Sequence, residues 1–461
     1  MLAVQLSALL DGETPGVTET LDLVTGFDDA LTHGLGRLGG DRAAALAALA
    51  GAVSASPLGD RAGEAVDKIT AGSVAGDHLT ALAGARTALL GAVHDALLAR
   101  LDTALGRTRA AWEAAAAPAP AADHLLAAAR SWLHELAITG WRGVDHDLVS
   151  ASSQTVEALL AEPRLRRVAV LLDGLAAELA ACCPIATAPR VPARRWADLW
   201  ARAVLLAQGL PADPDPEQVS GRLLVLGVDV HEHGTAVQAQ VHGLLEPAGG
   251  GAARLVRASV SAAKVDTITG PAVWRLLQAH PVLLGALAEH RSLDLTGMPL
   301  LAGGDLLWHD DRAAAGEPAD PFAVARVQLA DALAPAVTPL DRHPVRIAEP
   351  VLLEGYTVDG EALVLDGHPL AVELDRLPRC GPLTPELVAA STACIGLVRW
   401  DAGRWSVQPL AVQATVKRKP VTAHAGDWAL GPTDPKVVKA EAKAGDVVAV
   451  LRERAGRLLR K

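Results

Sequence analysis

Two short runs of the sequence carry side chains that bind metal ions or transfer protons. The first, His231–His233, places two imidazoles at positions i and i+2, which share one face of a β-strand and suit a bridging ion. Strand pairing around Gly234 sets His242 near Val225, roughly 15–20 Å from His231 at ~3.3 Å per residue, which is too far for a third ligand. The same pattern predicts, as the simpler alternative, a polar hairpin end exposed to water, and His231 and His233 there are candidate contacts for a protein partner.

The second run sets one imidazole beside two carboxylates. His309, Asp310 and Asp311 together suit a divalent ion or a general base. They also follow a predicted strand and precede an Ala/Gly loop, where acidic residues are common. Because the chain has no GxxxxGK[ST], GxSxG or HExxH motif, we assign no catalytic residue and no cofactor. A metal-dependent hydrolase built on this run is the alternative function.

A third group combines arginine with tryptophan. Trp196 and Trp200 are spaced i,i+4 and therefore lie on one face of a predicted helix. Arginine and tryptophan together are typical of protein-binding hot spots and of stacking on nucleic-acid bases. The alternative is that the tryptophans pack inside the helical region while the arginines are solvated. The arginines of this group are Arg190, Arg194, Arg195 and Arg202.

The C-terminal residues differ in charge from the rest of the chain. The whole chain has a formal charge of -11, but residues 417–461 carry 11 basic and 5 acidic residues. Such a segment suits an acidic partner or nucleic acid, and equally suits docking on the acidic body of its own chain. The candidate contact residues here are Lys417, Arg418, Lys419, Arg452, Arg454 and Arg457.

Composition indicates a folded chain with substantial cores. Half of the 461 residues are hydrophobic and 21% are charged. The acidic balance makes nucleic acid an unlikely partner, and the start of the chain lacks a basic signal-peptide region. Four cysteines form no CxxC pair, and no apolar stretch reads as a membrane span. We therefore predict a cytoplasmic protein with no membrane partner.

Periodicity predicts an α+β fold. Apolar residues recur at helical spacing over residues 1–209, which predicts a helical bundle or array. Residues 210–221 have the composition of a linker. Alternation of period two then predicts a β-rich domain over 222–416, barrel- or sandwich-like, with helical insertions. Residues 417–461 form a basic C-terminal segment with a helix from Pro435 to about Leu459.

Two neighbouring stretches resemble a known group of proteins. ARRWADLWARAVLLAQGLP (Ala193–Pro211) and VSGRLLVLGVDVHEHGTAVQAQVHG (Val219–Gly243) are similar to uncharacterised actinobacterial proteins encoded beside SWIM zinc-finger proteins, MoxR-type AAA ATPases and von Willebrand A-domain proteins. The chain itself lacks both the SWIM zinc pattern and Walker motifs. The resemblance implies an accessory component of an ATPase-linked assembly. We expect a non-catalytic adaptor or scaffold whose partners are proteins, such as a MoxR-type ATPase or a von Willebrand A-domain protein.

Overall fold

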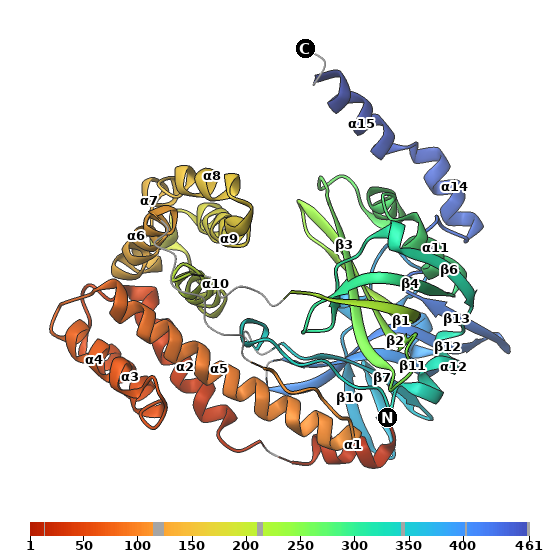
Figure 1. Ribbon diagram of the computed structural model, residues 1–461, viewed down its shortest axis with the longest axis horizontal. Coiled ribbons are helices and arrows are strands. Elements are labelled where there is room, and N and C mark those ends of the chain that lie inside the picture. The colour runs from red at the N-terminus through yellow and green to blue at the C-terminus, as the bar shows by residue number, and fades with distance from the viewer. Residues whose placement is uncertain (13, 114–123, 210–214, 343–345, 402, 459–461) are drawn as a thin grey trace.

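The first part of the chain is helical, as predicted. The computed structural model describes residues 1–12, 14–113, 124–209, 215–342, 346–401 and 403–458 (Figure 1). Helices that follow one another in the chain pack side by side and curve into an arc (Figure 1). They are α1 (Ala3–Leu10), α2 (Val17–His33), α3 (Gly40–Ala52), α4 (Gly59–Thr70), α5 (Gly76–Leu105), α6 (His124–Thr139), α7 (His146–Ser150), α8 (Ser153–Ala161), α9 (Arg166–Cys182) and α10 (Ala193–Leu206).

Helix α10 lies against the middle of this arc, where it packs on α2, α5, α6 and α9. Its Trp196 and Trp200 side chains are fully buried, and the Trp200 indole donates to the Leu133 carbonyl oxygen at 2.9 Å. The guanidinium of Arg86 on α5 is also fully buried and lies 2.7 Å from Asp28 and 2.6 Å from Asp198 of α10. Apolar packing and this buried ion cluster fix α10 against α5.

The first β-barrel begins inside the predicted linker, at Glu217. Strand β1 pairs with β2 and with β4, β2 pairs with β3, and β3 runs parallel to β5, which pairs with β4. The ring of pairings therefore closes. Val237, Ala239 and Val241, which alternate along the second strand, all lie in its core. The elements are β1 (Glu217–Glu232), β2 (Ala236–Pro247), β3 (Arg254–Ala263), α11 (Pro281–Glu289), β4 (Arg291–Leu300), β5 (Asp305–Leu306) and an added edge strand, β6 (Ala313–Pro318).

The second barrel repeats this order. Strands β7 and β8 form one bent segment that pairs with β11 on one side and β9 on the other, while β10 pairs with β9 and runs parallel to β12. The Asp366-Gly367 turn between β9 and β10 has positive φ at both residues, as a type I′ hairpin requires. The elements are β7 (Ala348–Glu354), β8 (Thr357–Asp359), β9 (Ala362–Leu365), β10 (His368–Val372), α13 (Pro385–Ala389), β11 (Ser391–Asp401), β12 (Arg404–Val416) and β13 (Lys419–His424).

Both barrels thus have the order 1-2-3-5-4-1, a parallel contact between the third and fifth strands, and a helix between the third and fourth. This is the connectivity of an OB fold, a Greek-key barrel. The barrels meet along β1, where a Cβ on Gly227 would lie 2.8 Å from Leu410 Cβ. Helix α12 (Pro321–Gln328) packs between the two barrels, and its Phe322 is fully buried among apolar side chains of both.

The N-terminal helices are part of the second barrel's core. Leu6 and Leu9 of α1 and Leu97 and Leu101 of α5 pack with the side chains inside this barrel. No described helix is long and apolar enough to cross a lipid bilayer.

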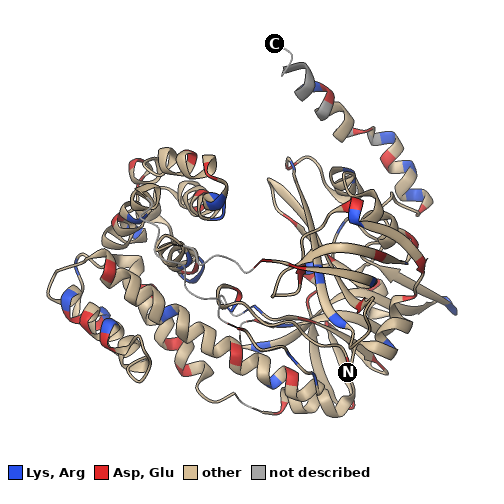
Figure 2. Cartoon of the chain, viewed as in Figure 1, with Lys and Arg blue, Asp and Glu red and all other residues tan. Residues whose placement is uncertain are grey.

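The C-terminal segment differs from its prediction in two ways. Lys417 and Arg418 form the turn of the β12–β13 hairpin, so residues 417–424 belong to the second barrel. Beyond it the predicted single helix is two, α14 (Pro435–Ala444) and α15 (Val447–Leu458), separated at Gly445, whose φ is +78°. Asp434 caps α14, as expected. Lys436, Lys439 and Lys443 of α14 are exposed and share one face of the helix, whereas its acid, Glu441, lies 2.9 Å from Arg275 (Figure 2).

Candidate ligand-binding pocket

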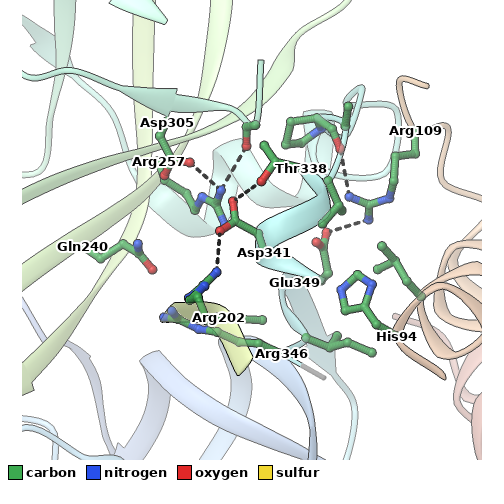
Figure 3. A pocket seen from close by; sticks show the side chains of 17 residues that line it. His94, Arg109, Arg202, Gln240, Arg257, Asp305, Thr338, Asp341, Arg346 and Glu349 are labelled. Atoms are coloured by element: carbon green, nitrogen blue, oxygen red, sulfur yellow. Dashed lines mark hydrogen bonds and ion pairs between the residues drawn. The ribbon is translucent and has the colours of Figure 1, made fainter. Parts of the chain in front are cut away.

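A polar pocket of about 210 Å³ lies where the helices, the first barrel and the segment between the barrels meet (Figure 3). We call it the junction pocket. Helices α5 and α10 form one wall, and the outer face of β2 and β3 forms another. The residues that line it and carry polar side chains are His94, Arg109, Arg202, Gln240, Arg257, Asp305, Thr338, Asp341, Arg346 and Glu349.

Arg257 brings a guanidinium to the floor of the pocket from β3. Its terminal nitrogen donates to Asp305 Oδ2 at 2.7 Å and to the Gly303 carbonyl oxygen at 2.9 Å. Its Nε is buried and has no hydrogen-bond partner among the described residues. Burial raises the pKa of Asp305, and Arg257 opposes that rise. The Nε–H of Arg257 is therefore an unsatisfied buried donor in a residue that lines the pocket.

Arg109 forms the opposite wall and is fully engaged by its own chain. It donates to Asp102 at 2.7 and 2.9 Å and to the Pro335 carbonyl oxygen at 3.1 Å, and it lies 3.1 Å from Glu349. Burial favours the neutral form of Glu349, but Arg109 and Arg107 hold its pKa below the usual value. These contacts fix the wall and neutralise its charge.

Arg202 and Arg346 lie near each other at the remaining side (Figure 3). Arg202 donates to the Leu340 carbonyl oxygen and lies 3.7 Å from Asp341, while burial lowers its pKa. Asp341 also accepts from Thr338 at 2.8 Å. Arg346 is exposed and has no carboxylate partner among the described residues.

The pocket therefore presents more positive than negative charge. Asp341 and Glu349 are held by Arg202 and Arg109, and Asp305 is held by Arg257, which leaves Arg346 uncompensated among the described residues. Buried His94 is neutral at pH 7, because burial lowers its pKa. Guanidinium groups recognise carboxylates and phosphates with paired donors. The volume and charge suit one small anionic group.

Sequence reasoning found one residue of this pocket, Arg202. Arg257, Arg346 and Gln240 were missed because their neighbours in the chain show no pattern, and only the folded chain brings them together. The alternation in β2 does place Gln240 on the polar, outward face of that strand, and this was the one sequence signal that pointed toward the pocket.

The remaining arginines around α10 lie at separate places. Arg194 is 3.2 Å from Asp28, Arg195 is bound by Glu178, and Arg190 is exposed before the helix begins. Because Trp196 and Trp200 are fully buried, the exposed surface of this helix offers arginines but no tryptophan to a partner. The two tryptophans therefore pack inside the helical region, which was the alternative to a binding surface.

The two histidines of the first hairpin lie apart from the junction pocket. His231 Nε2 is 2.9 Å from Asp229 Oδ2 at a second pocket of about 310 Å³, and His233 is exposed at the tip. His242 pairs with Gly227 rather than Val225, because the hairpin is centred between Gly234 and Thr235 and the pairing runs in unbroken register from there to His242. It is therefore remote from His231, as expected.

In the His309–Asp311 run, the central aspartate makes hydrogen bonds to neighbouring elements of its own barrel. Asp310 accepts from the Val282 amide at 2.8 Å, at the start of α11, and from the Trp308 indole at 2.7 Å. His309 and Asp311 are exposed. These three residues are not among the groups of three close metal-binding atoms found in the described residues.

The basic candidates are divided between a hairpin and a helix. Lys417, Arg418 and Lys419 are exposed at the β12–β13 tip, and Arg454 is exposed on α15. The side chains of Arg452 and Arg457 lie outside the described residues.

Comparison with models of protein families, with curated proteins and with solved structures gives no match to this chain.

Proposed function

We propose that the chain is a non-catalytic adaptor that binds other proteins, and that the junction pocket receives an acidic group of a protein partner. The observation that carries the proposal is Arg346, an exposed arginine without a described carboxylate partner beside the guanidinium groups of Arg202 and Arg257. A carboxylate entering here gains charge-assisted hydrogen bonds from groups that are already positioned.

The order of the elements supports the same function. The pocket is shared by α5, α10, β2, β3 and the segment between the barrels, so a ligand in it contacts units that are far apart in the sequence. A scaffold gains from such a site because one bound group holds several of its units together. The resemblance of residues 193–243 makes a MoxR-type ATPase or a von Willebrand A-domain protein the first partner to test.

The test begins with the tagged chain captured from its native host, with and without ATP, and identification of the proteins that co-purify. The identified partner is then purified and its dissociation constant is measured for wild type and for Arg346→Glu. We expect about a tenfold or greater weakening, since reversing a charge that faces an acidic group costs more than ~1.4 kcal/mol.

Arg37→Glu is the matched control, because Arg37 is exposed between α2 and α3 and does not line the pocket. It should bind like wild type. Equal affinities for Arg346→Glu and Arg37→Glu would remove the pocket from the interface, and the absence of any specific partner would refute the adaptor function.

A further inference from the structure

Two histidines and one aspartate from distant parts of the chain converge at the contact between the barrels. His290 follows α11 of the first barrel, His424 ends β13 of the second, and Asp427 lies in the next turn. One nitrogen or oxygen from each lies within 4.8 Å of those from the other two. Imidazole nitrogen and carboxylate oxygen are ligands that zinc prefers.

The carboxylate is held in a fixed orientation. Asp427 Oδ2 accepts from the His424 amide at 3.0 Å, and Oδ1 lies 2.8 Å from His290 Nε2. The turn between them has no space to shift, since a Cβ on Gly426 would lie 3.1 Å from Val228 and 3.2 Å from Leu287. The packed backbone of the turn and the His424 amide together hold the Asp427 carboxylate toward His290.

His424 carries an unsatisfied group at the same place. The residue is 5% exposed, and its Nε2 has no hydrogen-bond partner among the described residues. The ring packs edge-on against His290, with centroids 4.2 Å apart. Buried polar atoms are nearly always paired, so a buried imidazole nitrogen without a partner points to a missing ligand.

Both imidazoles line a small cavity of about 10 Å³. That is close to the space that one water molecule or one ion occupies. The other walls include Val225, Leu287 and Pro321, which offer no further side-chain ligand. The cavity is sized for an ion with at most one small ligand and excludes an organic substrate.

The backbone of His290 gives an independent reason to retain an imidazole here. Its φ is +52°, the left-handed conformation that glycine adopts at the end of a helix with the least strain. A histidine in this position costs conformational free energy, and such strain collects at functional positions.

We propose that His290, His424 and Asp427 bind one Zn²⁺ ion that links α11 of the first barrel to β13 of the second. Tetrahedral zinc places its ligand atoms ~3.3 Å apart, so the 2.8 Å pair opens slightly and His424 moves inward by side-chain rotation. A water molecule in the cavity completes the coordination. We assign the ion a structural role, because the cavity beside it has room for only one small ligand.

The experiment uses the full chain purified through a tag without histidine, stripped with a chelator, reloaded with Zn²⁺ or Co²⁺ and freed of excess metal. We expect about one zinc per chain by elemental analysis and, with Co²⁺, the visible absorption bands of a tetrahedral complex. Zinc should raise the melting temperature by about 3–5 °C when its concentration is ~100 times the dissociation constant.

His290→Gly and Asp427→Asn are the test variants, and the first also relieves backbone strain, so it should fold. Both should lose zinc, the cobalt bands and the thermal shift. His309→Ala is the matched control and should keep all three, because His309 is exposed outside this cluster. Less than about 0.2 zinc per reloaded wild-type chain would overturn the proposal, as would full zinc in His290→Gly. Zinc lost only in His309→Ala would assign the ion to the other run.

Discussion

At the scale of single residues, the barrel contact contains a histidine that cannot easily carry charge. His242 is 1% exposed, and its Nε2 has no hydrogen-bond partner among the described residues. Burial, assisted by Arg257 and Arg399, lowers its pKa to about 3, and the carboxylates of Asp229 and Glu349 only partly oppose this. The folded chain therefore holds His242 neutral where the unfolded chain protonates it.

We predict that this histidine makes the fold sensitive to mild acid. Its folded-state pKa of about 3 is below the unfolded value of ~6.5, so its contribution is complete above pH 6.5 and is lost as the pH falls toward 3. Between pH 7 and pH 5 the loss is about 2 kcal/mol, at ~1.4 kcal/mol per pH unit below 6.5. Urea unfolding at several pH values should show a shallower dependence for His242→Gln than for wild type. Parallel curves would contradict the assignment.

Local patterns predicted residues that act through near neighbours in the chain. The i,i+4 spacing of Trp196 and Trp200 and the turn at Gly234 needed only helix and hairpin geometry, and both agree with the structure. The partner of His242 was misplaced by two residues, because the turn is centred one residue further along the chain than the predicted pairing placed it. The approach of His290 to His424 was beyond reach, since nothing local relates residues of two different barrels.

At the scale of elements, a buried ion pair joins β1 of the first barrel to β11 of the second. Arg399 lies 2.9 Å from Asp229 Oδ2, and Gln408 donates to Oδ1 at 2.7 Å. Burial alone would raise the pKa of Asp229, but His231, Gln408 and Arg399 hold it at about 2, while burial lowers that of Arg399 to about 10. The two charges therefore depend on each other.

We predict strong coupling between these two residues. Asp229→Asn or Arg399→Met alone should lower the free energy of unfolding by about 3–5 kcal/mol, because each leaves one buried charge without its counterion. The double variant should lose clearly less than the sum of the two. A double-mutant cycle by urea unfolding measures this, and additive losses would show that the pair is not coupled.

Element types were easier to predict than element limits. Hairpins marked by Asp366-Gly367 and by the Gly234 turn were correct because their conformations demand particular residues. Helical periodicity runs without interruption over residues 145–162 and 271–290 and predicts one helix in each, yet the first range holds α7 and α8 and the second holds a 3₁₀ helix followed by α11. Apolar periodicity continues through such breaks, since both pieces bury the same face.

At the scale of the whole molecule, the first residues of the chain complete the core of its last barrel. Leu9 is fully buried among the side chains of the second barrel, whereas Val4 on the same helix is 71% exposed. The helical and β-rich regions follow the predicted order, but they share this core. The sequence could not show it, because α1 and β10 are more than 350 residues apart.

We predict that a change in α1 loosens the second barrel. Leu9→Ala should cost about 2–5 kcal/mol of unfolding free energy, the usual range for a buried leucine, and should speed hydrogen exchange in β10 and β12. Val4→Ala is the control and should stay within ~0.5 kcal/mol of wild type. If Leu9→Ala leaves exchange in these strands unchanged, α1 is an appendage rather than part of the barrel.

Because α1 shares a core with the second barrel, part of its packing must wait until that barrel has been synthesised. Helix α1 is synthesised before the second barrel, yet the Met1 amine beside it bonds to the carbonyl oxygen of Leu352, 351 residues later. At about 5–20 residues per second, that partner appears roughly 20–70 s afterwards. During this interval the apolar face of α1 can reach its native contacts on α5 but not those on the second barrel. Until that barrel is made, α5 covers only part of the face of α1 that the finished fold buries.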